Sequence, residues 1–110
     1  MINFDLIKTL DDVKNELRRN EELRDECYKE ILDSTIFSKF TNVEGVITDI
    51  NEKTIFVNYE SWESIPLKLD RYKESLITED YLTKIIDDYL STYKDERKLK
   101  RLIKKFEENK

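Results

Sequence analysis

The 110-residue sequence contains no alanine, glutamine or histidine, and only one glycine, one proline and one cysteine. Without histidine, the commonest proton carrier and metal ligand at neutral pH is absent. The single glycine cannot supply a phosphate-binding loop of the Walker or dinucleotide type, which needs several. The single cysteine, Cys27, cannot form an internal disulfide, and its helical spacing from Leu23 and Ile31 favours a buried thiol over a nucleophile. We therefore expect a protein that is not an enzyme and that binds no metal or cofactor.

Long apolar runs are also lacking. No stretch approaches the roughly 20 apolar residues that a membrane-spanning helix requires, and the first residues lack the cationic-then-apolar order of a signal peptide. Enough apolar and aromatic residues are present for one modest core, including five Phe, six Tyr and one Trp. We expect a single cytoplasmic domain over residues 1–110, with no membrane partner.

The N-terminal third has the pattern of two short helices. Thr9 is a suitable N-cap, with Asp12 three residues later, for a helix over about 10–19. Asn20 is a suitable N-cap for a second helix over about 21–34. One face of this second helix is apolar and is expected to face the core, while the other is densely charged.

The only glycine and the only proline both lie between Val43 and Leu69, where the side chains alternate between apolar and polar. This alternation predicts a three-stranded antiparallel sheet over about 43–69. Pro66 has no backbone donor, which predicts that its strand lies at a sheet edge or beside a bulge. Gly45 predicts either a bulge or the close approach of an aromatic ring. The expected fold class is α+β, with the sheet flanked by N-terminal and C-terminal helices.

Three segments of this region carry a resemblance to a known family. The order Gly45–Ile47, Thr54–Tyr59 and Ile65–Leu67 resembles the strand, hairpin and strand of SH3-like or Tudor-like small barrels found in bacterial nucleic-acid machinery and phage proteins. The resemblance covers about a quarter of the chain and implies a barrel of about five strands. Only three strands can be found in the sequence, so we expect a three-stranded meander covered by helices.

The C-terminal region predicts helix over about 79–108, with Thr78 as a suitable N-cap. Its apolar residues form two sets that are rotated by roughly a third of a turn at 100° per residue. Either the helix breaks near 94–96, or one continuous helix presents its halves to different surfaces. The first set is Leu82, Ile85, Ile86, Tyr89 and Tyr93, and the second is Leu99, Leu102, Ile103 and Phe106.

Charge is unevenly distributed along the chain. The basic tail, residues 94–110, carries eight Lys or Arg and four Asp or Glu, whereas residues 1–93 carry 12 and 21. The tail has the pattern of a basic amphipathic helix, which can pack on acidic helices of its own chain or of a second copy, or can bind phosphates. A homodimer through the C-terminal helix is therefore possible. The candidate phosphate-binding residues are Arg97, Lys98, Lys100, Arg101, Lys104 and Lys105.

Two functions are compatible with these patterns. The first is a non-enzymatic inhibitor or adaptor that binds another protein, using an acidic surface to occupy a nucleic-acid-binding site on a host factor. The second is a nucleic-acid accessory protein that binds phosphates through the basic tail, although direct binding is disfavoured by the acidic body. The residue composition, rich in Lys, Asn, Ile and Tyr, resembles that of small phage and mobile-element proteins of low-GC Gram-positive bacteria, which include anti-CRISPR and host-takeover inhibitors. The candidate partner-binding residues are Glu21, Glu22, Asp25, Glu26, Trp62 and Glu63.

Overall fold

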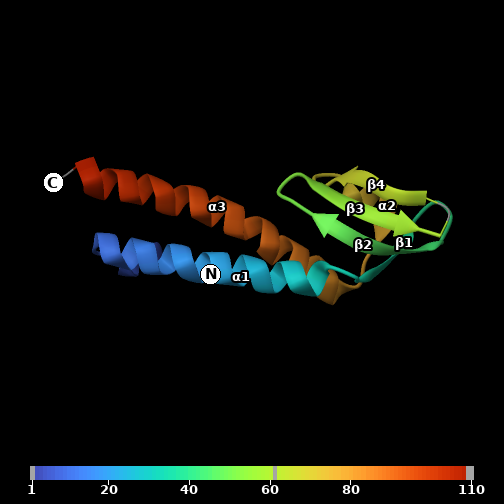
Figure 1. Cartoon of the computed structure of the whole chain (residues 1–110), viewed down its shortest axis with the longest axis horizontal. Helices are drawn as coiled ribbons and strands as arrows, with labels where there is room; N and C mark the ends of the chain where they lie inside the picture. Colours follow the sequence, from blue (N-terminus) through green and yellow to red (C-terminus); the bar gives the residue numbers. More distant parts are fainter. Residues whose placement is uncertain (1, 61, 109–110) are drawn as a thin grey trace.

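Two long antiparallel helices are joined at one end to a small antiparallel sheet (Figure 1). The computed structural model describes residues 2–60 and 62–108, without the side chains of 62–64. The helices are α1 (Leu10–Ile31) and α3 (Asp80–Glu108), and a short 3-10 helix, η1 (Phe4–Leu6), precedes α1. The molecule measures 58 × 21 × 19 Å, and its radius of gyration is 17.1 Å, whereas a compact chain of this length has about 13 Å. The helix pair therefore extends well beyond the sheet.

Helix α1 begins as predicted but does not break at Asn20. Thr9 accepts a hydrogen bond from the Asp12 backbone, and the Asp12 side chain accepts from the Thr9 backbone, which completes a capping box. The expectation of two helices, 10–19 and 21–34, differs from the single helix observed. Asn20 caps nothing here: its side chain is buried against α3 instead of turning back onto the backbone.

The sheet has five strands, so the prediction of three was wrong, whereas an antiparallel sheet flanked by helices at both ends was correct. The two strands that were missed have four and two residues, too few for an alternating pattern to stand out. The order across the sheet is β4-β3-β2-β1-β5, with every pairing antiparallel. The elements between the long helices are β1 (Thr35–Ser38), β2 (Glu44–Ile50), β3 (Thr54–Tyr59), β4 (Trp62–Lys68), α2 (Tyr72–Ser75) and β5 (Leu76–Ile77).

The glycine and the proline have separate structural roles. Pro66 lies in β4, which is an edge strand as predicted. Gly45 pairs with Tyr59, and a Cβ atom on Gly45 would lie 2.9 Å from two carbons of the Tyr59 ring. The close approach of a ring is thus the correct alternative for Gly45. The register shift in β2 falls further along, between Ile47 and Asp49. It allows both Ile47 and Ile50 to face the core.

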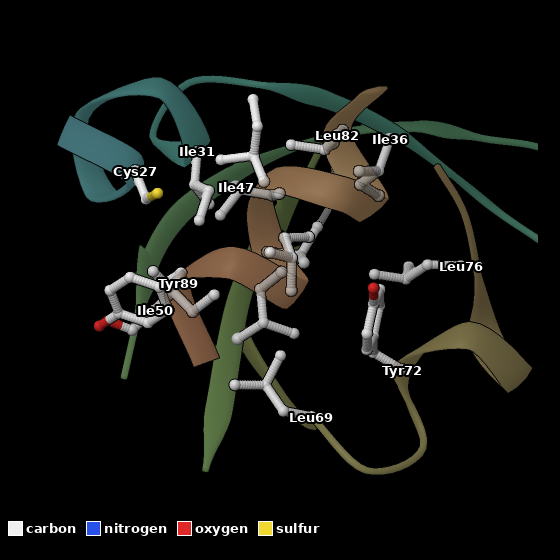
Figure 2. Packing of buried hydrophobic residues seen from close by; sticks show 14 residues of the cluster. Cys27, Ile31, Ile36, Ile47, Ile50, Leu69, Tyr72, Leu76, Leu82 and Tyr89 are labelled. Carbon is white, nitrogen blue, oxygen red and sulfur yellow. The ribbon is translucent and has the colours of Figure 1, made fainter. Parts of the chain in front are cut away.

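The hydrophobic core lies between the inner face of the sheet and the ends of α1 and α3 nearest to it (Figure 2). Cys27 and Ile31 enter this core from the last turns of α1, which places the thiol in the interior as expected. The other buried members are Ile36, Ile47, Ile50, Ile55, Val57, Leu69, Tyr72, Leu76, Leu82, Ile85, Ile86 and Tyr89.

Helix α3 is continuous, so there is no break near 94–96, and its two apolar sets share one inward stripe instead of facing different surfaces. Along the contact of α1 with α3, inward residues recur at alternating spacings of three and four, the heptad pattern of a left-handed helix pair. We call this contact the helical seam. Polar residues occupy the middle of this seam, and this interruption divides the apolar residues of α3 into the two sets noted in the sequence. The seam consists of Leu10, Val13, Leu17, Asn20, Arg24, Cys27 and Ile31 in α1, and Leu82, Ile85, Tyr89, Thr92, Glu96, Leu99, Ile103 and Phe106 in α3, all buried or half-buried.

Candidate interaction surfaces

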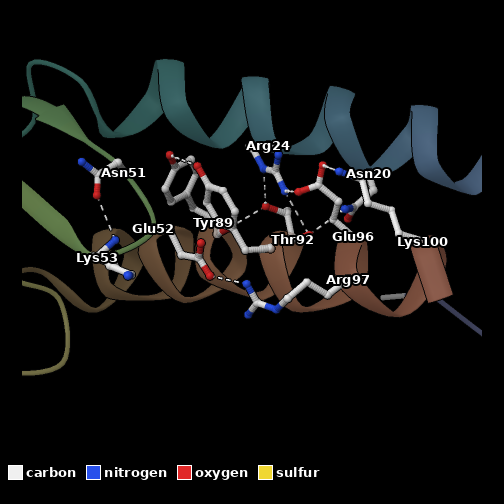
Figure 3. Close-up of polar contacts among 11 residues, drawn as sticks. Asn20, Arg24, Asn51, Glu52, Lys53, Tyr89, Thr92, Glu96, Arg97 and Lys100 are labelled. Carbon is white, nitrogen blue, oxygen red and sulfur yellow. Dashed lines mark hydrogen bonds and ion pairs between the residues drawn. The ribbon is translucent and has the colours of Figure 1, made fainter.

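A layer of polar side chains crosses the middle of the helical seam (Figure 3). The Asn20 side-chain amide donates a 2.7 Å hydrogen bond to the Thr92 carbonyl oxygen. Arg24 donates at 2.9 Å to the Thr92 hydroxyl and at 2.9 Å to the Glu96 carboxylate. We call Asn20, Arg24, Thr92 and Glu96 the polar layer. A shift of one helix by a turn would leave these groups unpaired, so the layer favours a single alignment of α1 with α3.

Glu96 is held as a carboxylate within this layer. Its hydrogen bond from Arg24 lowers the pKa of the Glu96 carboxyl below the ordinary value of 4.5, an effect that burial partly opposes and that Lys100, 3.4 Å away, reinforces. The Arg24 guanidinium also stacks on Tyr93, with its central carbon 3.9 Å from the ring centre. The layer is thus a charged and well-satisfied part of the structure.

Two contacts attach the sheet to the helix pair beside the polar layer. The Tyr89 hydroxyl donates to the Ile50 carbonyl oxygen at 3.3 Å and lies 2.9 Å from the Tyr93 hydroxyl. Burial raises the pKa of Tyr89, so this hydroxyl keeps its proton. From the β2–β3 turn, Glu52 forms an ion pair with Arg97 on the outer side of α3 (Figure 3). Both contacts lie on the same flank of the helical seam as the sheet.

The four acidic residues proposed on α1 form one exposed surface. Glu21, Glu22, Asp25 and Glu26 occupy consecutive turns, and all four side chains are exposed. None of them forms an ion pair with another described residue. The sequence grouping therefore corresponds to a patch of exposed carboxylates, with Arg18 and Lys29 one turn away along the helix, which we call the acidic α1 face.

The six cations proposed as phosphate ligands are all exposed along the second half of α3. Half of them have contacts within the chain, namely Arg97 with Glu52, Lys100 with Glu96 and Lys98 with the Phe4 ring at 5.6 Å. The others, Arg101, Lys104 and Lys105, make no ion pair with described residues. The basic half packs on α1 through Leu99, which is fully buried.

Trp62 and Glu63 belong to the edge strand β4, and Trp62 pairs through its backbone with Tyr59 of β3. Their side chains lie outside the described residues. The structure therefore places the backbone of these two candidates at the start of the edge strand and leaves their role as a prediction.

A group of apolar side chains that the sequence did not reveal lies on the outer face of the sheet, next to Glu44, the cross-strand partner of Phe37 in β2. Phe37 of β1 and Ile77 of β5 are direct cross-strand partners, and they are 40% and 47% exposed. Phe56 and Pro66 are partners in β3 and β4, and the strand alternation places them on the same side. We call these four residues with Val46 the outer sheet face. Phe40, in the adjoining β1–β2 turn, is 81% exposed.

The outer sheet face and the polar layer were both missed by the sequence analysis, but for different reasons. Alternation within Thr35–Ser38 is hidden because Ile36 and Phe37 are both apolar, although they point to opposite faces. The polar layer was detectable in principle, because Asn20 and Arg24 continue the three-and-four spacing of the apolar residues in α1.

The described residues contain no group of three or more His, Cys, Asp or Glu side chains placed to hold a metal ion. Among those same residues, no helix is both long and apolar enough to cross a membrane. Burial raises the pKa of the Cys27 thiol, and negative charges led by Asp88 add to the shift.

Comparison of the chain with protein families, with curated proteins and with solved structures found no significant match.

Proposed function

We propose that the chain is a non-enzymatic, cytoplasmic adaptor or inhibitor that works by binding another protein, of the type produced by phages and mobile elements. The observation that carries this proposal is the outer sheet face. Exposed apolar side chains that gather on one face of a sheet are candidates for a site of association, where aromatic residues commonly dominate the binding energy. Phe37 and Ile77, paired across two strands, are the proposed centre of contact.

The acidic α1 face supplies a second feature of this function. Unpaired carboxylates in a row would be attracted to a cationic nucleic-acid-binding site on the partner and would accelerate encounter at low salt. An anti-CRISPR-like or other host-factor inhibitor that occupies such a site fits this charge. The partner class we propose is therefore a nucleic-acid-binding protein of the host.

We extend the same proposal to the resemblance to SH3-like or Tudor-like barrels. Five strands occur, with a one-turn helix between β4 and β5, and such barrels have about five. The resemblance concerns the fold of the binding module and leaves the choice of partner to the exposed surfaces.

Affinity capture from a low-GC Gram-positive lysate, followed by binding of the purified captured protein, tests this function. Replacing Phe37 and Ile77 by Asp should abolish capture while preserving the circular dichroism spectrum, because both side chains are already partly in water. The matched control is Tyr81→Asp, which changes a 63% exposed aromatic residue on α3, outside the outer sheet face. Equal capture by the double variant and the wild type would contradict the proposed contact.

A second candidate function is nucleic-acid binding through the basic tail, favoured by Arg101, Lys104 and Lys105, which are exposed and form no ion pair with the described residues. Six phosphate contacts would make affinity fall steeply with salt. Titration of duplex and single-stranded nucleic acid with the full chain and with a chain ending at Tyr93, over a salt series, distinguishes the two functions. Absence of salt-sensitive binding by the full chain would eliminate this candidate.

A further inference from the structure

A groove runs along one flank of the helical seam, where two adjoining hollows share Phe4 and Lys98. One wall is a stripe of α3 whose members recur at spacings of three and four. We call it the α3 stripe. It consists of Asp88, Ser91, Asp95, Lys98, Leu102 and Lys105. The other flank of α3 carries the Arg97–Glu52 contact with the sheet, whereas the groove lies on the opposite flank, where Ile2, Phe4 and Ile7 of the N-terminal segment also line it.

The groove combines apolar residues with an ordered change of charge. Leu23 on the α1 wall is 39% exposed, and Phe4, Ile7 and Leu102 are half-buried. A pair of helices leaves such residues in water, whereas a bundle of four helices encloses them. Apolar area is therefore available for a further helix to cover.

Charge on the helix pair reverses from one end to the other. The half next to the sheet, residues 21–31 and 80–93, carries three Lys or Arg against eight Asp or Glu. The distal half, residues 10–20 and 94–108, carries ten against seven. Along the α3 stripe the charged positions follow the same order, acidic at Asp88 and Asp95 and basic at Lys98 and Lys105.

We propose that this groove is the interface of an antiparallel homodimer, in which α3 of each copy lies against the groove of the other across a two-fold axis. An axis midway between Asp95 and Lys98 sets Asp95 against Lys98 of the second copy. The same axis sets Asp88 against Lys105, and Ser91 against Leu102. Every charged position of the α3 stripe then meets the opposite sign, and symmetry repeats each contact.

The self-complementary charge order selects a second copy over other occupants. An acidic partner would satisfy Lys98 and Lys105 but would place negative charge against Asp88 and Asp95. A basic partner would have the reverse defect. A second copy in antiparallel orientation is the arrangement that satisfies both ends at once, over the roughly 25 Å that separates Asp88 from Lys105 at 1.5 Å per residue. This dimer does not depend on the function proposed above.

Disulfide trapping tests the orientation. In the variant carrying both Ser91→Cys and Leu102→Cys, intermolecular disulfides should form, because these positions face each other across the axis. Within one helix they are about 16 Å apart and cannot be bridged. Each single variant should remain unlinked, and so should the wild type, whose Cys27 is buried. Cross-linking of either single variant to itself would indicate a parallel dimer and would overturn the proposal.

Reversing the charges at paired positions tests the contacts, with dimerisation of the full chain measured by sedimentation equilibrium. Lys105→Asp or Asp88→Lys alone should weaken dimerisation at least about tenfold, since symmetry counts each change twice. The two changes together should restore the dimer to within about threefold. Lys104→Asp is the matched control, because the adjacent side chain points about 100° away around the helix. A wild type that stays monomeric at 0.5 mM and low salt, an equal effect of Lys104→Asp, or a double variant that is not restored would each overturn the proposed interface.

Discussion

Arg24 of α1 stacks its guanidinium on the ring of Tyr93 of α3, with 3.9 Å between the guanidinium carbon and the ring centre. This stacking holds the planar group so that it also binds the Glu96 carboxylate at 2.9 Å. The arrangement places a cation and an anion in a contact between two helices that is apolar on either side of the polar layer. The Arg24–Glu96 pair therefore contributes in two ways, through its own interaction energy and by fixing the alignment of α1 with α3.

Replacing either partner of this pair should cost stability, whereas replacing both should not. We expect Arg24→Leu or Glu96→Leu alone to lower the free energy of unfolding by about 1–3 kcal/mol, because one partly buried charge loses its partner. The double variant should unfold at a urea concentration equal to or above that of the wild type. The control pair is Arg19–Glu16, where Arg19 is 65% exposed and a double-mutant cycle should give less than about 0.5 kcal/mol. A similar coupling for both pairs would contradict this prediction.

The free energy of unfolding should decrease in acid because the Glu96 carboxylate becomes protonated. Because its pKa is lower in the folded state than the ordinary 4.5, its contribution is fully present above about pH 4.5 and is lost as the pH falls through the folded-state value. Glu96→Gln should be less stable than the wild type at pH 7, and the difference should shrink below pH 4.5. Urea unfolding at half-unit pH intervals measures it. A difference that stays constant from pH 7 to pH 3 would show that the charge of Glu96 is not involved.

Gly45→Ala should destabilise the sheet, because the added methyl group would lie 2.9 Å from the Tyr59 ring. We expect a loss of about 1–3 kcal/mol in the free energy of unfolding, typical of overpacking. Combining Gly45→Ala with Tyr59→Val should recover part of the loss relative to Tyr59→Val alone. If Gly45→Ala costs the same in both backgrounds, the ring is not the cause.

Two buried tyrosines should respond oppositely to loss of the hydroxyl group. The Tyr72 hydroxyl is buried and forms no hydrogen bond of good geometry with a described residue; burial is the first cause that raises its pKa to about 12, and the nearby Thr83 side chain opposes the rise. Tyr72→Phe should therefore be neutral or stabilising by up to about 1 kcal/mol. Tyr89→Phe removes contacts to Ile50 and Tyr93 and should cost about 1 kcal/mol. Thermal unfolding of both variants makes the comparison, and equal losses would contradict it.

The regular central part of the fold was predictable from short-range patterns. Pro66 correctly indicated an edge strand, and the helix expected over 79–108 begins one residue later than predicted, at Asp80. Alternation is a strong signal in β2, β3 and β4, where six or seven residues repeat it. In β5, two residues cannot show a period, and only pairing with β1 makes them a strand.

The polar layer shows why the remaining features escaped prediction. Asn20 is a favoured N-cap residue, so a local interpretation ends one helix there and starts another. In the structure its side-chain amide donates a hydrogen bond to the carbonyl oxygen of Thr92, 72 residues further along the chain. Arg24 and Glu96 likewise have ordinary surface character in the sequence, and only the antiparallel alignment of the two helices brings them together. Such long-range pairing is absent from any local window of residues.

The continuous α3 has a consequence for how the sheet is held together. The 48 residues between Ile31 and Asp80 form a closed loop whose two ends are joined by the helix pair (Figure 1). Joining the ends in advance lowers the entropy that the strands must lose when they pair. Weakening Arg24 or Glu96 should thus make the sheet more costly to assemble, although neither side chain belongs to it. Contact between α1 and α3 closes the loop, and the pairing of the strands depends on the two helices staying together.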